Sequence, residues 1–445
     1  KANDKVKKDF NATRDGLLTD LLKDACLDFQ KDVKPWLGSE VAAATLPGAS
    51  NGKTESIVLV RVKDEGRARQ VLETSFTASC QQAGRRTRAF RIVNGFAVIA
   101  TQDDAAANTV ALDAVSAQAK AADGGLAKAA PFVRLVGQLH GDRLLVGYAD
   151  GKQAADLAGT RLSSNGCDAL GTLGVSGRVA FDVHAEASAV VLEAVGDQAG
   201  TPLRTGSPKL TEGLPPSTTG ALTIFDIGGL TRTLLACTGQ KAQATANLAD
   251  QAGLDLDADI LSWMGGEAAI VAGPFRSGRS LPDFGLVVQT TDHASAAKAL
   301  DKLKAKLVED GAELTDVDVA GTKGSTIAAS SSDATAQPAV VLLPDRLILS
   351  TSPEFLQELA KPPSPGFGQT SGYRKVVGSA TGGTQSQLVL NVTAIKDAIV
   401  ASLPSASRDR YRQNVAPQLD PIDSVGLRVF VQGGFSRLEL RVALR

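Results

Sequence analysis

The chain has 445 residues, a formal net charge of −1 and a hydrophobic content of 43%. The near-neutral charge gives no electrostatic basis for binding nucleic acid or an anionic membrane, and the aromatic content of 4% argues against base-stacking platforms. No run of about 18 apolar residues could span a bilayer. Because the chain begins with Lys1 and holds a single Met, Met264, we expect a fragment or processed form without its signal or anchor segment.

The first half of the chain predicts alternating helices and strands. Leucines recur at helical spacing over residues 16–26, which indicates an amphipathic helix. A short helical turn is expected at residues 32–36, capped by Asp32 and followed by a left-handed exit at Gly38. Asn94-Gly95 is a strong hairpin turn signal. The other predicted elements are strands at residues 41–46, 57–62, 89–91, 95–101, 143–149 and 179–195, and helices at residues 64–73 and 104–122.

The second half of the chain repeats the first. Residues 21–47 and 248–274 align without a gap at an offset of 227, the difference between Trp36 and Trp263, which are the chain's two Trp. Chance at average composition gives about two identities over this length. The observed identities are at Leu21, Ala25, Leu27, Asp28, Asp32, Trp36, Gly38, Glu40, Ala42 and Pro47. The chain is therefore predicted to be an internal duplication.

The repeat extends beyond this segment. At an offset of 228, three positions of one predicted helix match three of another, namely Asp64, Ala68 and Leu72 with Asp292, Ala296 and Leu300. A closing hairpin through Gly433-Gly434 mirrors residues 178–194. The elements expected in the second half are strands at residues 214–227, 284–290, 315–319 and 387–392, hairpins at residues 340–351 and 424–444, and helices at residues 292–307, 353–359 and 394–403.

These patterns predict an α+β fold of two similar halves, each a mostly antiparallel sheet covered by helices on one face. We expect the first repeat at residues 1–195, a Gly-, Pro-, Ser- and Thr-rich linker at residues 196–219 and the second repeat at residues 220–445. The counterpart of the opening strand of the second half falls before residue 1. We therefore expect that the first half lacks its first strand, that this strand lies upstream in the full-length protein, and that one sheet edge is unpaired.

Four cysteines are candidates for disulfides: Cys26, Cys80, Cys167 and Cys237. None falls in a Cys-x-x-Cys pair, and their spacing does not resemble a zinc site. An even number of cysteines fits two disulfides in an exported protein, with three possible connectivities. The alternative is four buried, reduced thiols.

The repeated residues around each tryptophan favour structural roles. Trp36 and Trp263, with Gly38 and Gly265, could line a ligand groove, but we expect each tryptophan to anchor a helix-to-strand corner in the core. The paired acids could bind a cation, but Asp favours caps and turns, which is the role that we expect for Asp28, Asp32, Asp255 and Asp259. The sequence assigns no catalytic, cofactor-binding or metal-binding residue.

Three histidines are available for acid–base chemistry: His140, His184 and His293. None lies in a His-Glu-x-x-His arrangement, and the chain has no Gly-x-Ser-x-Gly motif. His184 alternates with Asp182 and Glu186 in a predicted strand, which favours a place on the polar face.

One run of residues resembles a known family. Asp32-Val33-Lys34-Pro35-Trp36-Leu37-Gly38, with IVLVRVKDEGRA at residues 57–68, NGFAVIAT at residues 94–101 and Leu214-Pro215-Pro216, resembles DUF3352, a family of uncharacterised actinobacterial envelope proteins. The resemblance implies an exported domain, outside the cytoplasm or at the cell surface, tethered by an upstream transmembrane segment. It carries over no established activity or catalytic residue.

Three functions remain open. The first is a non-enzymatic exported binding or scaffold module of a bacterial cell envelope, without cofactor, whose partner is an envelope protein. The second is a carrier or sensor of a lipid or other apolar ligand, which a large apolar pocket would favour. The third is a hydrolase, which requires His140, His184 or His293 within hydrogen-bonding reach of a Ser or Asp in a cleft.

Overall fold

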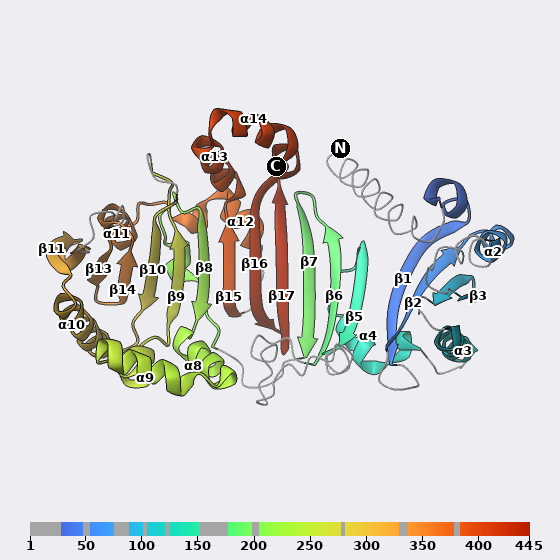
Figure 1. Ribbon diagram of the computed structural model, residues 1–445, viewed down its shortest axis with the longest axis horizontal. Coiled ribbons are helices and arrows are strands. Elements are labelled where there is room, and N and C mark those ends of the chain that lie inside the picture. Colours follow the sequence, from blue (N-terminus) through green and yellow to red (C-terminus); the bar gives the residue numbers. More distant parts are fainter. Residues whose placement is uncertain are drawn as a thin grey trace. The chain divides into compact units, whose positions relative to one another are not determined.

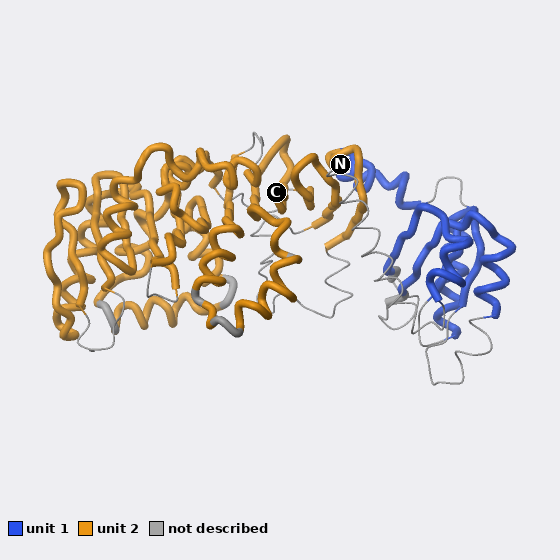
Figure 2. Tube along the Cα trace, turned by 90° about the horizontal axis from the view of Figure 1, so that it is seen from above, with its two compact units in different colours: residues 1–137, 153–160 blue, residues 138–152, 161–445 orange. Residues whose placement is uncertain are grey.

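The structure is a computed structural model that describes residues 28–47, 54–74, 89–100, 105–120, 125–151, 177–197, 204–276, 281–328, 337–377 and 383–445. The chain forms two compact units (Figure 2), of which unit 1 contains residues 1–137 and 153–160 and unit 2 contains residues 138–152 and 161–445. In the part of the chain that the structure describes, no helix is long and apolar enough to cross a membrane. The helix predicted at residues 16–26 lies outside the described residues.

Unit 1 is built on a four-stranded antiparallel sheet in the order β1-β2-β4-β3 (Figure 1). The hairpin predicted at Asn94-Gly95 is confirmed, because both residues have positive φ angles, of 51° and 75°, between β3 and β4. The elements are β1 (Leu37–Pro47), β2 (Thr54–Val62), β3 (Ala89–Val93), β4 (Phe96–Ala100), η1 (Phe29–Val33), α2 (Glu65–Thr74), α3 (Ala105–Lys120), η4 (Leu126–Lys128) and α4 (Ala130–Val136).

The described residues of unit 2 form one antiparallel sheet of 13 strands in the order β11-β12-β13-β14-β10-β9-β8-β15-β16-β17-β7-β6-β5 (Figure 1). Its strands are β5 (Leu145–Asp150), β6 (Arg178–Ala185), β7 (Ala189–Asp197), β8 (Gly220–Phe225), β9 (Glu267–Ala272), β10 (Phe284–Gln289), β11 (Glu313–Val319), β12 (Thr322–Ala328), β13 (Ala339–Leu342), β14 (Arg346–Ser350), β15 (Gly383–Leu390), β16 (Ile422–Gln432) and β17 (Phe435–Leu444). Its helical elements are α7 (Lys209–Glu212), α8 (Ile227–Thr238), α9 (Lys241–Ala252), η5 (Leu256–Leu261), α10 (His293–Glu309), α11 (Pro353–Ala360), η6 (Phe367–Gln369), α12 (Ser371–Val377), α13 (Val392–Ser402), α14 (Ser405–Asn414) and α15 (Ala416–Leu419).

Helical elements pack on both faces of each sheet, so the expectation of helices on one face was wrong. In unit 2, Val287 packs with Phe355 of α11, whereas its neighbour Val288 packs with Trp263 and with Ala296 of α10. In unit 1, one core includes residues of η1 and α2 and the other includes residues of α3. The physical reason is that adjacent strand residues point to opposite faces, and apolar residues occupy both positions.

The strand orders of the two halves repeat. β9-β10-β14-β13 follows the same order as β1-β2-β4-β3, and β15-β16-β17 corresponds to β5-β6-β7. The compact units differ from the repeats expected at residues 1–195 and 220–445, whose boundaries stay a prediction. β7 pairs along the whole of β17, which places β5 to β7 in the sheet of the second half.

The predicted linker at residues 196–219 also differs from a free connection. β7 continues to Asp197, and within the segment Gly206 forms a β-bridge with Thr384. Thr211 and Leu214 are buried. The Gly- and Pro-rich composition here allows the chain to fold back onto the sheet rather than to separate two domains.

Candidate functional site

The two tryptophans anchor the same corner in each half. The indole Nε1 of Trp36 donates to the carbonyl oxygen of Asp32 at 2.6 Å, and that of Trp263 donates to the carbonyl oxygen of Asp259 at 2.7 Å. The exposed fractions of the two side chains are 1% and 4%. The neighbours repeat as well, since Ala68 and Leu72 share the core of Trp36, and their matched residues on α10 share that of Trp263. Each indole therefore fills a core, and a hydrogen bond satisfies its Nε1 donor.

The acids beside each tryptophan stabilise a single π-helical turn. Asp28 and Asp255 are the N-caps, whose side chains accept amides of the turns, so the expectation that Asp32 caps the first turn was wrong. The turn begins before Asp32, whose carboxylate instead accepts the Asp28 amide at 2.9 Å, as Asp259 does for Asp255. Among the described residues, no group of three His, Cys, Asp or Glu side chains could hold a metal ion.

Gly38 and Gly265 serve different needs. A Cβ on Gly38 would lie 2.7 Å from Cγ of Arg61 and 2.8 Å from its carbonyl oxygen, so the close approach of β2 requires glycine. Gly38 is absent from the described glycines with positive φ, and the predicted left-handed exit was wrong. A Cβ on Gly265 would meet nothing closer than 3.5 Å.

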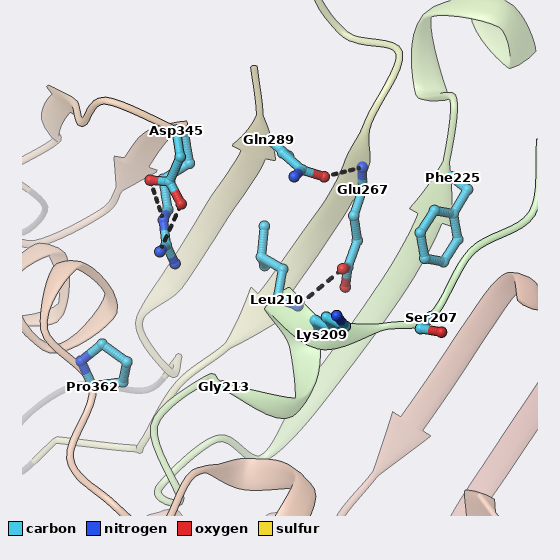
Figure 3. A pocket seen from close by; sticks show the side chains of 10 residues that line it. Ser207, Lys209, Leu210, Gly213, Phe225, Glu267, Gln289, Asp345 and Pro362 are labelled. Atoms are coloured by element: carbon cyan, nitrogen blue, oxygen red, sulfur yellow. Dashed lines mark hydrogen bonds and ion pairs between the residues drawn. The ribbon is translucent and has the colours of Figure 1, made fainter. Parts of the chain in front are cut away.

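A cavity of about 380 Å³ lies beside the second corner (Figure 3). Charged and amide groups face it together with apolar ones, which distinguishes it from an apolar lipid pocket. Asp345 and Arg346 form a bidentate ion pair at its rim, with both distances 3.0 Å. The residues that line it are Ser207, Lys209, Leu210, Gly213, Phe225, Glu267, Gln289, Asp345, Arg346 and Pro362.

Glu267, on β9, is the buried acid of this cavity, with an exposed fraction of 4%. Its carboxylate accepts the amide of Leu210 at 2.9 Å (Figure 3). It also accepts the amide of Thr211 at 2.9 Å and the Thr211 hydroxyl at 3.0 Å. Burial raises the pKa of Glu267, and these hydrogen bonds oppose the rise. Three donors from one short segment thus satisfy a carboxylate that the sheet would otherwise bury without partners.

A row of buried and half-buried polar side chains crosses the sheet of unit 2 near this cavity. Two of its members bond side chains outside the row, since the hydroxyls of Thr223 and Thr211 lie 2.5 Å apart and Gln387 Nε2 donates to the Tyr373 hydroxyl at 2.9 Å. Burial raises the pKa of Glu193 against the lowering effect of Arg437. The members of the row, which are successive cross-strand partners, are Asp182, Glu193, Glu439, Arg428, Gln387 and Thr223.

Two of the three histidines come together at one end of this row. The rings of His140 and His184 stack with centroids 4.3 Å apart. His184 Nδ1 lies 2.8 Å from Oδ1 of buried Asp182, and His184 Nε2 lies 3.9 Å from Oε1 of Glu186. The ring nitrogens of His184 therefore face carboxylates. His293 is exposed at the first position of α10 and takes no part in this stack.

The cysteines give no structural information on disulfides. Cys26, Cys80 and Cys167 lie outside the described residues. The backbone of Cys237 belongs to α8. Two disulfides therefore remain a prediction.

The corners differ in what lies beside their strands. β9 pairs with β10 on one side and with β8 on the other. Its counterpart β1 is the first strand of its sheet and pairs with β2 alone among the described strands. Val41 of β1 is 54% exposed, whereas Ala268, its match at an offset of 227, is 2% exposed. Within the described ranges, β1 therefore presents an open edge where β9 has a neighbour.

The hydrogen-bonding pattern identifies the outward amides of β1. Val62 donates to Gly95 of the β3–β4 turn, so every second residue of β2 faces β4. Leu59 then faces β1, where it pairs with Ala42. Because amides alternate along a strand, those of Val41 and Ala43 point to the open edge.

Unit 2 has a second edge that no described strand pairs with. β5 is the last strand of that sheet, and its Leu145 and Val146 are 49% and 48% exposed. The opposite end of the sheet is β11, whose sequence ELTDVDV carries three acids. Charges of this kind protect an edge against pairing, and the apolar residues of β5 do not.

Sequence reasoning did not single out Glu267, the open edge of β1 as a binding surface, or the stacked histidines. The identity of Glu40 and Glu267 in the aligned repeat was an available signal for the first. The stack of His140 on His184 depends on a contact between distant segments, for which the sequence holds no local signal.

Comparisons with known proteins identify one family. The family described as protein of unknown function DUF3352 matches residues 2–129 and 234–444, which include both tryptophan corners, so the chain belongs to this family. No curated protein and no solved structure matched the chain.

Proposed function

We propose that this member of the DUF3352 family is a non-enzymatic binding or scaffold module of a bacterial cell envelope, and that an extended polypeptide segment completes its unit 1 sheet along β1. The observation that carries the proposal is that β1 pairs with no described strand on the edge where its counterpart β9 is paired with β8. An extended segment that adds to a sheet edge gains main-chain hydrogen bonds, and alternate side chains give it specificity.

The chemistry of the segment follows from β8, which covers the equivalent edge. β8 reads Gly-Ala-Leu-Thr-Ile-Phe and is uncharged. On β9 it sets Leu222 opposite Ile270 and Ile224 opposite Ala268. An uncharged segment with β-branched and large apolar residues at alternate positions therefore fits the edge of β1.

The other functions receive less support from the site. The cavity beside Glu267 offers charged and amide groups, which suit an apolar ligand poorly. His184 faces the carboxylates of Asp182 and Glu186, an arrangement that holds the ring but does not activate a hydroxyl nucleophile. An envelope location, outside the cytoplasm and tethered by an upstream membrane segment, is part of the proposal and rests on the family resemblance.

The proposal is tested with a fluorescent synthetic peptide of residues 214–227, titrated against the whole chain by anisotropy. We expect saturable binding that Ala43→Pro weakens at least about tenfold, because proline removes an outward amide and leaves the β1–β2 ladder intact. Absence of saturable binding, or binding that Ala43→Pro leaves unchanged, overturns the proposal.

A matched pair of peptides sharpens this test. Asp226 donates to Gly266 and Asn391 donates to Thr219, so the amides of Leu222 and Ile224 face β9 while those of Ala221 and Thr223 face β15. N-methylation at Leu222 and Ile224 is therefore expected to abolish binding to β1. N-methylation at Ala221 and Thr223 is the control and should leave the binding to β1 unchanged. The reverse result would contradict the proposed edge.

A further inference from the structure

We infer that residues 138–144 form an acid-sensitive strap, which is bonded to the polar row of unit 2 and is released when His140 on the strap and His184 beneath it both gain a proton. The strap connects α4 to β5, and it belongs to unit 2. The inference concerns unit 2 alone and is independent of the segment proposed for β1.

Main-chain hydrogen bonds attach the strap to β6. The amide of His140 donates to Oδ2 of Asp182 at 3.0 Å, and the amide of Leu144 donates to the carbonyl oxygen of Val183 at 2.7 Å. Between these two points Leu139 and His140 lie on the sheet, and Leu139 is buried. Asp182 is fully buried, so the strap satisfies an acid of the row that water does not reach.

The two stacked histidines differ in what surrounds them. Their rings lie 14° from parallel. Both ring nitrogens of His184 face carboxylates, those of Asp182 and Glu186. His140 is exposed, and in the described part of the chain no acid forms an ion pair with its ring. A positive charge on His184 would therefore keep two carboxylates as partners, whereas a positive charge on His140 would face the other ring.

Protonation of both rings opposes the closed strap. Histidine is the side chain that ordinarily gains its proton between about pH 8 and pH 5. Two positive charges in stacking contact repel each other, and the closed strap holds them together. An open strap separates the two rings and binds both protons without this repulsion. Because the open state binds more protons, its population rises as the pH falls.

Other charged groups lie near the pair, and one of them requires a control. Carboxyl groups ordinarily titrate below about pH 5, but burial raises the pKa of Glu193. Glu193 pairs with Arg437, which also donates to the carbonyl oxygen of Gln138 on the strap. Protonation of Glu193 is therefore the competing cause of a pH response. The charged groups on the strap and on the strands packed against it are Asp142, Arg143, Asp182, Glu186, Glu193, Arg437, Glu439 and Arg441.

Amide hydrogen exchange in the whole chain at about pH 7.5 and pH 5.5 tests the inference. After correction for intrinsic exchange, the protection of the His140 and Leu144 amides should fall at least about tenfold at the lower pH. The amide of Leu440, on a strand that is paired on both sides, is the internal reference and should keep its protection. Unchanged protection at His140 and Leu144 would overturn the inference.

Three variants identify the group that responds. His140→Phe keeps a ring that can stack but cannot gain a proton, so the strap should stay protected at both pH values. His293→Phe removes an exposed histidine from α10 and should leave the response intact, as should Glu193→Gln. A response that persists in His140→Phe, or that disappears in Glu193→Gln, would assign the pH dependence to the acids and overturn the inference.

NMR titration of the histidine rings gives a second test that needs no variant. We expect His140 and His184 to gain their protons in two coupled steps, because each charge acts on the other ring. His293 should follow a single-site curve and serves as the reference. Independent single-site curves for His140 and His184 would show that the stacked rings do not interact when charged, and would overturn the inference.

Discussion

The two tryptophan corners have nearly the same local structure and different surroundings. Asp28 and Asp255 cap equivalent turns, and each indole bonds an equivalent carbonyl oxygen. Beyond the corner, Glu267 is buried under a bound segment of the same chain, whereas Glu40 is exposed. The comparison teaches that the repeat encodes the corner itself, and that a neighbouring strand decides whether the edge beside it is core or surface.

The largest expected effect comes from removing either anchor. Trp36→Ala should destabilise unit 1 by about 3–5 kcal/mol, since it truncates a fully buried aromatic side chain. Hydrogen exchange in β2 and β4 would measure this loss. Trp263 is then the sole tryptophan, and its fluorescence should report an unchanged denaturation midpoint for unit 2. Trp263→Ala should destabilise unit 2 and leave the denaturation midpoint of unit 1, followed by the fluorescence of Trp36, unchanged. Loss of both units in either variant would contradict two separately packed units.

A proline pair tests the difference between the edges. The amide of Ile270 points to β8, so Ile270→Pro should cost about 3 kcal/mol in unit 2 by removing a ladder hydrogen bond from a central strand. Ala43→Pro changes the matched residue of β1, whose amide faces the open edge, and should cost less than about 1 kcal/mol in unit 1. Urea unfolding of both variants measures the contrast. Equal losses would show that the edge of β1 is already paired.

The two acids should also respond differently. Glu267→Ala leaves the amides of Leu210 and Thr211 buried without acceptors, and we expect a loss of about 2 kcal/mol. Glu40→Ala should change stability by less than about 0.5 kcal/mol, because the side chain is exposed. Chemical denaturation of the two variants measures this difference, which a comparable loss in both would refute.

The smallest effect concerns Tyr373 and Gln387. At an offset of 241 the first half has Phe132 and Val146 in their places. Tyr373→Phe alone should cost about 1 kcal/mol through its lost hydrogen bond with Gln387, and adding Gln387→Val should recover part of that loss. A double-mutant cycle in urea measures the coupling, and additive losses would contradict it.

The same tyrosine gives a pH dependence. Burial raises the pKa of Tyr373 from 10.0 to about 12. Because its pKa is raised, the folded state holds the Tyr373 proton more tightly than the unfolded state does. The resulting contribution to the free energy of unfolding is complete below pH 10 and is lost as the pH rises toward 12. Tyr373→Phe should therefore reduce the fall in stability over this range. An unchanged alkaline profile would show that Tyr373 titrates normally.

The sequence alone predicts much of each corner and little of what surrounds it. The tryptophan unit, the Asn94-Gly95 hairpin and most strands follow from local patterns that each half repeats. The pairing of β7 with β17 does not, because a sheet of unit 2 joins strands from both halves and residue alternation does not specify the partner. The sequence did not predict the burial of Glu267 either, because its partners Leu210 and Thr211 lie more than 50 residues away in sequence.

Amide hydrogen exchange in β1 at single-residue resolution tests the central claim most directly. In the free chain, Val41 and Ala43 should exchange rapidly, while Ala42, whose amide faces β2, should be protected. Saturation with the peptide of residues 214–227 should protect Val41 and Ala43 and leave Ala42 unchanged. Protection of Val41 and Ala43 in the free chain, or their continued rapid exchange in the presence of bound peptide, would contradict an open edge that takes up an extended segment.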